Sequence, residues 1–308
     1  LPTFLTGASS DFLEYPALGH PHDTSRYSSN GLGGYLRQPP SPRPRSLSAP
    51  FTPSSDSACS YFTVQPVPQT YDPNFDYNYL NLDTSFYKQI VAGALIPVTG
   101  SNSASAESLL TAARITSYML AGRPDIVQIL KDNQIHAVVM GMNETTTDVP
   151  EHSDLTPAST WDGYRGLGAT RSRKATSVGE ENMLCKVGCS YNQNAQNDQC
   201  DIYHGENILV HEFGHTMTSS GGASWSPPIY LNADSTGGEI TQILLDAYNT
   251  ATNQNKWDNT YAATNSVEYA AEGIQSFFDV NMEGTTNGNG VHNHVNTRSE
   301  LMTYDSTL

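Results

Sequence analysis

The sequence contains few basic residues. Lys and Arg together number 15 against 31 Asp and Glu, which leaves a formal net charge of -16. Binding to a nucleic-acid backbone requires clustered Lys and Arg that release phosphate counterions, and attraction to an anionic membrane surface requires the same charge. The composition therefore predicts that the chain has no nucleic-acid partner and no membrane partner.

Long hydrophobic runs are also missing. The longest nearly apolar stretch covers residues 90–98, whereas a membrane-spanning helix needs about 20 apolar residues. The mean hydropathy is -0.45. We expect a soluble protein, and its 308 residues are enough for about two domains or for one domain with an appended segment.

Cysteine is scarce. The chain has four, Cys59, Cys185, Cys189 and Cys200. A structural zinc site usually shows two close pairs of ligands, so two disulfides are the favoured interpretation, and their connectivity stays open. Any such pairing joins Cys59 to the 185–200 segment.

Disulfides indicate an oxidising compartment. Two further features agree with this: a glycosylation sequon at Asn143 and Leu1 in the place of an initiator methionine. We therefore expect a secreted, extracellular glycoprotein whose chain begins after processing.

Proline is concentrated near the N-terminus, where 12 of the 18 prolines lie within residues 1–75. This composition does not favour regular structure, but the recurring aromatic residues are unlike a solvated linker. We predict that residues 1–83 form an extended irregular arm packed on the body. Residues 84–308 are predicted to form one α+β domain, with strands first and helices last.

Hydrophobic periodicity and end signals locate the elements of this domain. Helices are predicted at 106–121, 124–131, 204–219, 236–254 and 266–280. A buried strand is predicted at 135–140 and an edge strand at 175–184.

The strongest chemical signal is the pentapeptide HEFGH at residues 211–215. On a helix, His211 and His215 project from one face one turn apart and can present two imidazoles to one zinc ion. Glu212 then lies beside them, where it can take a proton from a metal-bound water. Val210, Phe213 and Met217 form a separate apolar stripe, which indicates a helix that packs on one side and faces a cleft on the other.

A catalytic zinc site needs a third protein ligand. A metzincin would have glycine at position 218 and histidine at 221, and Thr218 and Gly221 exclude that class. The carboxylates that remain are Asp234, Glu239, Glu268 and Glu272. Glu239 follows His215 by a distance acceptable for a thermolysin-like arrangement, but it suits an exposed helix N-terminus equally well.

The helix predicted at 266–280 is apolar over most of its circumference. Its narrow polar stripe consists of Glu268, Glu272, Gln275 and Asp279. Burial of unpaired carboxylates is costly, so this stripe needs partners, and a zinc ion with its histidines would supply them.

These residues resemble a known family. HEFGH at 211–215, followed by YAATNSVEYAAE at 261–272, is similar to the catalytic domain of the anthrax lethal factor family of zincins, over residues 204–280. The resemblance implies a zincin-like metallopeptidase domain with a small β-sheet and active-site helices. It implies Glu268 as the third zinc ligand, Glu272 as a carboxylate hydrogen-bonded to a liganding histidine, and Tyr261 as a phenol aimed at the oxyanion. It does not extend to the choice of substrate.

The sequence thus predicts a secreted zinc metallopeptidase with one catalytic Zn²⁺, Glu212 as the base and a protein or peptide substrate. Two alternatives stay open: a zinc hydrolase of a non-peptide amide in a glycan or peptidoglycan, and a non-catalytic, toxin-like binding protein. His292 and His294 could bind a second metal or line the cleft, but a polar loop with surface histidines is the favoured interpretation.

Overall fold

The computed structural model describes residues 62–185, 201–203, 205–218 and 239–308, and it describes 239–241 by backbone alone. The chain divides into two compact units, Leu1–Pro53 and Ser54–Leu308, and all described residues belong to the second. The predictions for residues 1–61, for Cys59, Cys189 and Cys200, and for Asp234 lie outside the described residues. Among the described residues, no helix is both long and apolar enough to cross a membrane.

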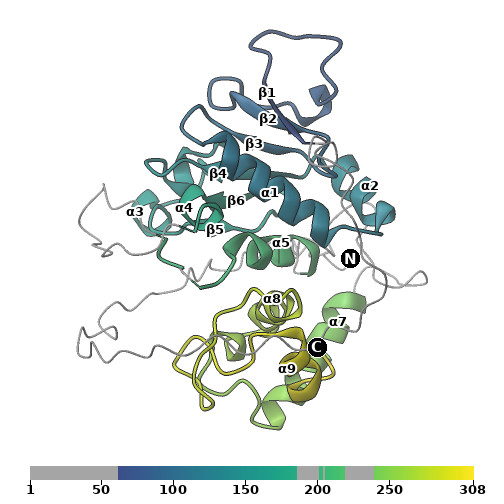
Figure 1. Ribbon diagram of the computed structural model, residues 1–308, viewed down its shortest axis with the longest axis vertical. Helices are drawn as coiled ribbons and strands as arrows, with labels where there is room; N and C mark the ends of the chain where they lie inside the picture. Colours follow the sequence, from purple (N-terminus) through teal and green to yellow (C-terminus); the bar gives the residue numbers. More distant parts are fainter. Residues whose placement is uncertain (1–61, 186–200, 204, 219–238) are drawn as a thin grey trace, which may run out of the picture. The chain divides into compact units, whose positions relative to one another are not determined.

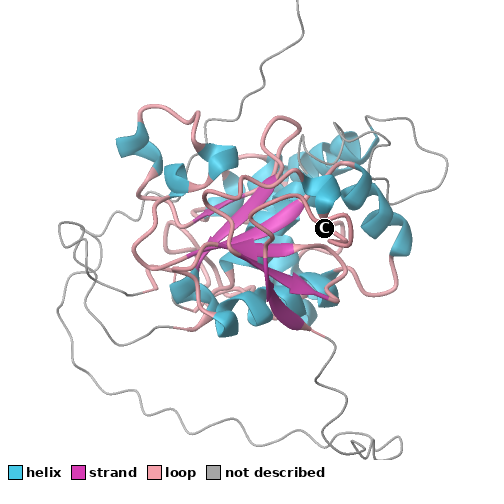
Figure 2. Ribbon diagram, turned by 90° about the horizontal axis from the view of Figure 1, so that it is seen from above, coloured by secondary structure: helices cyan, strands magenta, loops and turns pink. Residues whose placement is uncertain are grey.

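The centre of the described unit is a six-stranded mixed sheet with the strand order β1-β2-β3-β4-β6-β5 (Figure 2). The strands are β1 Thr63–Pro66, β2 Gln89–Ala92, β3 Val98–Gly100, β4 His136–Met140, β5 Gly166–Leu167 and β6 Ala175–Gly179. β3, β4 and β6 run parallel, and the other neighbouring pairs are antiparallel. The prediction of an α+β domain with a small sheet is confirmed in this coarse form.

The described residues form eight α-helices. They are α1 Ala106–Met119, α2 Pro124–Asp132, α3 Ala158–Trp161, α4 Glu180–Met183, α5 Ile208–Thr218, α7 Glu239–Asn253, α8 Ser266–Phe277 and α9 Arg298–Tyr304. Short 3₁₀ helices cover Asn78–Leu80, Thr146–Asp148, Pro150–His152 and Tyr261–Ala263. The five predicted helices are all present. Their ends lie up to four residues inside the predicted limits, with the largest difference at the start of α5, except that α2 ends one residue beyond its predicted limit.

Two details of the sequence prediction are wrong. The edge strand predicted at 175–184 is wrong in two respects. Only residues 175–179 form a strand, and this strand, β6, is paired on both sides, with β4 and with β5. Glu180–Met183 form α4 instead. All five residues of β6 are buried, and their small and β-branched side chains suit an interior position. The general order of strands first and helices last is also wrong, although the predicted ranges had already placed two helices before the strand at 135–140. α1 and α2 lie between β3 and β4, whose parallel pairing requires a crossover connection.

The predicted arm, residues 1–83, contributes one strand to the sheet. Within it, β1 pairs along its whole length with β2, so this part of the segment is a strand of the sheet. Residues 1–61 of the predicted arm lie outside the described residues.

α5 lies between the sheet and α8 (Figure 1). One face of α5 enters the core beneath the sheet, where Leu109 of α1, Val139 of β4 and Leu209 of α5 are fully buried together. A separate core holds α7, α8 and α9, with Trp257 and Tyr269 as its largest side chains. α5 and α8 therefore meet as two helices that are each anchored in a different core.

Candidate metal centre

Local hydrogen bonds fix the start of α5. The side chain of Asn207 accepts from the backbone N–H of Val210 at 3.1 Å, and that of Asn182 accepts from the N–H of Ile208 at 2.9 Å. Such partners satisfy the exposed N–H groups of a first helical turn. Val210 and Phe213 are buried as predicted, which leaves His211 and His215 on the opposite side.

α5 is also held by close contacts with the sheet. A Cβ atom at Gly168 would lie 2.8 Å from the Cβ of His215, so only glycine permits this approach of the chain after β5. Thr216 of α5 accepts a hydrogen bond from the N–H of Ala169 at 2.9 Å and bonds to the hydroxyl of Thr176 in β6 at 2.7 Å. The histidine-bearing turn is therefore rigidly attached to β5 and β6.

The third member of the site comes from α8. Asn265 caps this helix and accepts from the N–H groups of Val267 and Glu268, which places Glu268 in the first turn. α5 packs closely on α8 at Gly214, where a Cβ would lie 3.2 Å from Cδ1 of Ile274. This close approach brings the polar stripe of α8 against the histidines.

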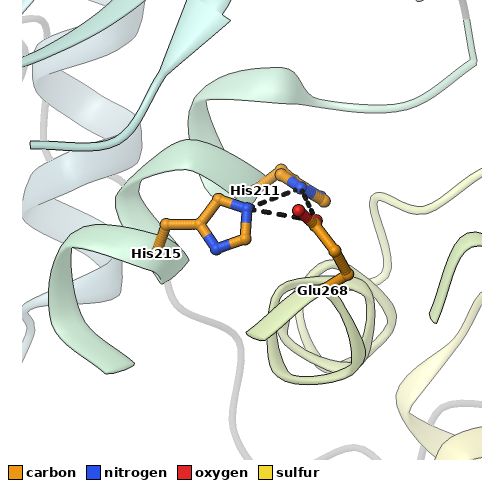
Figure 3. A group of neighbouring side chains, drawn as sticks. All are labelled: His211, His215 and Glu268. Carbon is orange, nitrogen blue, oxygen red and sulfur yellow. Dashed lines mark hydrogen bonds and ion pairs between the residues drawn. The ribbon is translucent and has the colours of Figure 1, made fainter. Parts of the chain in front are cut away.

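His211, His215 and Glu268 converge on one point (Figure 3). The Nε2 atoms of the two histidines are 3.0 Å apart. Oε2 of Glu268 lies 3.1 Å from Nε2 of His211 and 3.2 Å from Nε2 of His215. Three ligand atoms thus form a nearly equilateral triangle.

The residues present fit a zinc ion. Tetrahedral ligands about 2.1 Å from zinc lie roughly 3.4 Å apart, so the observed triangle needs to expand only slightly. Two imidazoles and one carboxylate are a ligand set that zinc accepts, and three protein ligands leave a fourth position for water.

The electrostatics of the site favour an ionised Glu268. Burial alone would raise the pKa of its carboxyl, but the imidazoles of His215 and His211 hold that pKa well below its usual range. The ligand is therefore a carboxylate, the form that binds a metal.

Glu212 lies beside the triangle and against the sheet. Burial raises the pKa of its carboxyl, although His215 and His211 oppose the shift and the backbone N–H of Gly168 donates a hydrogen bond to it. A raised carboxyl pKa suits a general base that works near neutral pH.

Tyr261 lies on the Tyr261–Ala263 turn before α8, with its ring centroid 6.4 Å from that of His211. Burial and the charge of Glu268, to which its hydroxyl is hydrogen-bonded, raise the pKa of the phenol. The phenol stays protonated and available as a donor at the edge of the site.

Glu272 also lies where the sequence suggested, beside a histidine of the site. Its Oε1 is 3.6 Å from Nδ1 of His211, an ion-pair distance. The hydrogen bond from this nitrogen goes to Gln275 instead, whose Oε1 is 2.8 Å away. The difference arises because Gln275, one turn further along α8, reaches the same ring edge.

Sequence reasoning placed Gln275 on the polar stripe without giving it a role, and it did not single out Glu206. It also placed His292 on a surface loop, which is wrong, since only 5% of its surface is exposed. His292 contacts Glu206 and Glu272, and these three residues form a second buried cluster. The sequence offered one signal for these contacts: Glu272 lies on the polar stripe of a buried helix, and a buried carboxylate needs a partner.

The remaining candidate residues contribute no described side chain to the site. Asp234 and the side chain of Glu239 lie outside the described residues. Cys185 is exposed, and its three possible disulfide partners lie outside the described residues, so the disulfides stay a prediction. His294 lies apart from both clusters and packs its ring edge-on against Tyr304.

Comparison with known proteins adds no assignment. No protein-family model matches the chain, and no curated protein matches it. The functional argument therefore depends on the geometry of the site.

Proposed function

We propose that the chain is a zinc-dependent metallopeptidase of the zincin type, similar to the anthrax lethal factor family. The observation that carries the proposal is the triangle of His211, His215 and Glu268, with ligand atoms 3.0–3.2 Å apart and Glu212 next to it on α5. A metal-binding protein without turnover would need the triangle but not the neighbouring carboxylate of Glu212.

In the proposed reaction, a zinc ion held by His211, His215 and Glu268 would lower the pKa of a bound water and polarise the substrate carbonyl. Glu212 accepts the proton of the attacking water and later delivers it to the leaving amine. Tyr261 donates a hydrogen bond to the oxygen on which negative charge develops. Gly168 holds the Glu212 carboxylate in place through its backbone N–H.

The position of β5 favours a peptide over another amide. β5 is the last strand of the sheet, and it runs directly above Glu212, since a Cβ at Gly166 would lie 3.1 Å from Oε1 of Glu212. In the described part of the chain its outer edge carries no further strand. An extended peptide can pair with such an edge through its backbone, which would bring a peptide bond over the metal.

The extracellular location belongs to the same proposal. Asn143 of the sequon is exposed on a turn, where a glycan would meet no steric obstacle. Secretion and disulfide formation themselves are supported only by the sequence.

The test combines zinc analysis with substrate screening. We expect about one zinc per chain and hydrolysis of a mixed peptide library, with no release of acyl groups from acylated amino sugars or peptidoglycan. Glu212→Gln removes the base but no ligand, so it should keep its zinc and lose roughly 10²- to 10⁴-fold in rate.

Glu107→Gln, the same substitution at an exposed position of α1, is the control and should be fully active. Unchanged turnover by Glu212→Gln would refute the proposed role of Glu212. Activity on amino-sugar amides alone would transfer the proposal to the second class of hydrolase.

A further inference from the structure

A buried polar network lies behind His211, on the side away from the triangle. It contains Gln275 and Glu272 of α8, Glu206 from the segment before α5, and His292 from the C-terminal segment. All four side chains belong to residues at most 8% exposed. Because buried polar groups are costly unless paired, the pairing within this network restricts how each group can be oriented.

The orientation of the Gln275 amide follows from its neighbours. Its Nε2 lies 3.0 Å from a carboxylate oxygen of Glu206 and 3.2 Å from the backbone carbonyl of Asn207. Both are acceptors, so the NH₂ end of the amide must face them. The carbonyl end therefore faces His211, at 2.8 Å from Nδ1.

This orientation decides which nitrogen of His211 carries a proton. The amide oxygen of Gln275 can only accept, so Nδ1 of His211 must donate. In a neutral imidazole the other nitrogen, Nε2, then has a free lone pair, and Nε2 is the atom that faces His215 and Glu268.

We infer that Gln275, oriented by Glu206, is the positioning residue that fixes the ring and the tautomer of His211 for metal binding. The inference deepens the proposed function, because it assumes that the triangle binds zinc. Gln275 touches neither the metal position nor the substrate, and it acts through His211.

His292 completes the network as a bridge between two acids. Its Nε2 lies 3.5 Å from Glu206 and its Nδ1 lies 3.4 Å from Glu272. Each nitrogen thus faces a different carboxylate. In this arrangement the imidazole joins the two acids and holds Glu206 in place.

Two substitutions at position 275 separate positioning from stability. Gln275→Met keeps the length of the side chain but removes the acceptor for His211, and zinc affinity should fall about 10- to 100-fold. Gln275→Glu keeps an acceptor for His211 but places a second carboxylate about 3 Å from Glu206, which is unfavourable. It should therefore be the less stable variant while binding zinc more tightly than Gln275→Met.

The control is Gln242→Met on the exposed face of α7, where the amide bonds only to Asp246 among the described residues. It should match the wild type in both measurements. Zinc affinity is measured by competition with a chromophoric chelator, and stability by urea unfolding of the metal-free protein. If zinc affinity follows stability across the variants, Gln275 has only a structural role and the inference is overturned.

A second measurement does not depend on zinc. In protein labelled with ¹⁵N-histidine, the Nδ1–H proton of His211 should give a slowly exchanging, downfield NMR signal, assigned by its loss in His211→Gln. The signal should disappear in Gln275→Met and remain in Gln275→Glu. A signal that persists in Gln275→Met would overturn the inference.

The outcomes also distinguish the inference from the proposed function. A wild type that shows the Nδ1–H signal but binds no zinc would refute the proposed function and leave the hydrogen bond to Gln275 established. Two zinc ions per wild-type chain, reduced to one by His292→Ala, would overturn the role of His292 as a bridge.

Discussion

The two buried His–Glu clusters are nearly alike in composition but differ in geometry. The first joins two histidines and Glu268, and the second joins Glu206, Glu272 and His292. α8 contributes one glutamate to each, Glu268 and Glu272, which lie one turn apart on the same helix face. In the first cluster three ligand atoms meet at one point, whereas in the second an imidazole lies between two acids. The comparison teaches that two clusters of similar residues differ in function according to where the imidazole nitrogens point: towards one common point in a metal site, and towards two separate carboxylates in an ion-paired cluster.

The sharpest test of this difference is the loss of one carboxylate from each cluster. Glu268→Gln replaces a charged ligand with a neutral amide, and zinc affinity should fall by more than about 100-fold. Glu206→Gln weakens the support of Gln275 and the contact of Glu206 with His292 but removes no ligand. The loss of zinc affinity should therefore stay within about 10- to 100-fold, the range typical of residues outside the ligand shell. Chelator competition measures both, and equal losses would mean that the two clusters act alike.

An effect of comparable size is expected on stability, and there the second cluster should matter more. His292→Ala leaves two buried carboxylates without their counter-charge, and breaking a buried pair costs about 3–5 kcal/mol. His294→Ala, two residues along, removes a ring packed against Tyr304 and should cost about 1 kcal/mol. Urea unfolding of the zinc-loaded proteins checks this, and similar costs would show that His292 is not the bridge.

The smallest expected effect is a change in pH dependence. Burial lowers the pKa of His292, but the carboxylates of Glu206 and Glu272 raise it to about 10. A histidine whose pKa rises on folding stabilises the fold fully below its unfolded pKa of about 6.5 and loses that contribution as the pH rises through the folded value. The stability advantage of the wild type over His292→Ala should therefore shrink between about pH 6.5 and pH 10.

The measurement uses zinc-loaded protein, so that the metal site is in the same state for both variants. Unfolding curves at several pH values give the difference directly. A difference that stays constant up to pH 10 would contradict a charged His292.

Much of the local structure could be predicted from the sequence. α1, α2, β4 and α8 follow from short-range apolar periodicity and from end signals such as Pro124 at the start of α2. The position of β6 could not be predicted in this way, because pairing with β4 and β5 depends on segments distant in the chain. The buried state of His292 was missed for the same reason, since its surrounding residues are polar and resemble a surface loop.

The sequence by itself determined the spacing of His211, Glu212 and His215, because residues four apart on a helix share a face whatever surrounds them. It also determined that α8 carries a polar stripe on an apolar helix. Only the tertiary structure decided which stripe residue meets which histidine. The contacts of His211 with Glu268 and with Gln275 span 57 and 64 residues, and that of Gln275 with Glu206 spans 69. Such contacts depend on how α5 and α8 pack, and packing is set by the two cores that anchor these helices and not by either segment alone.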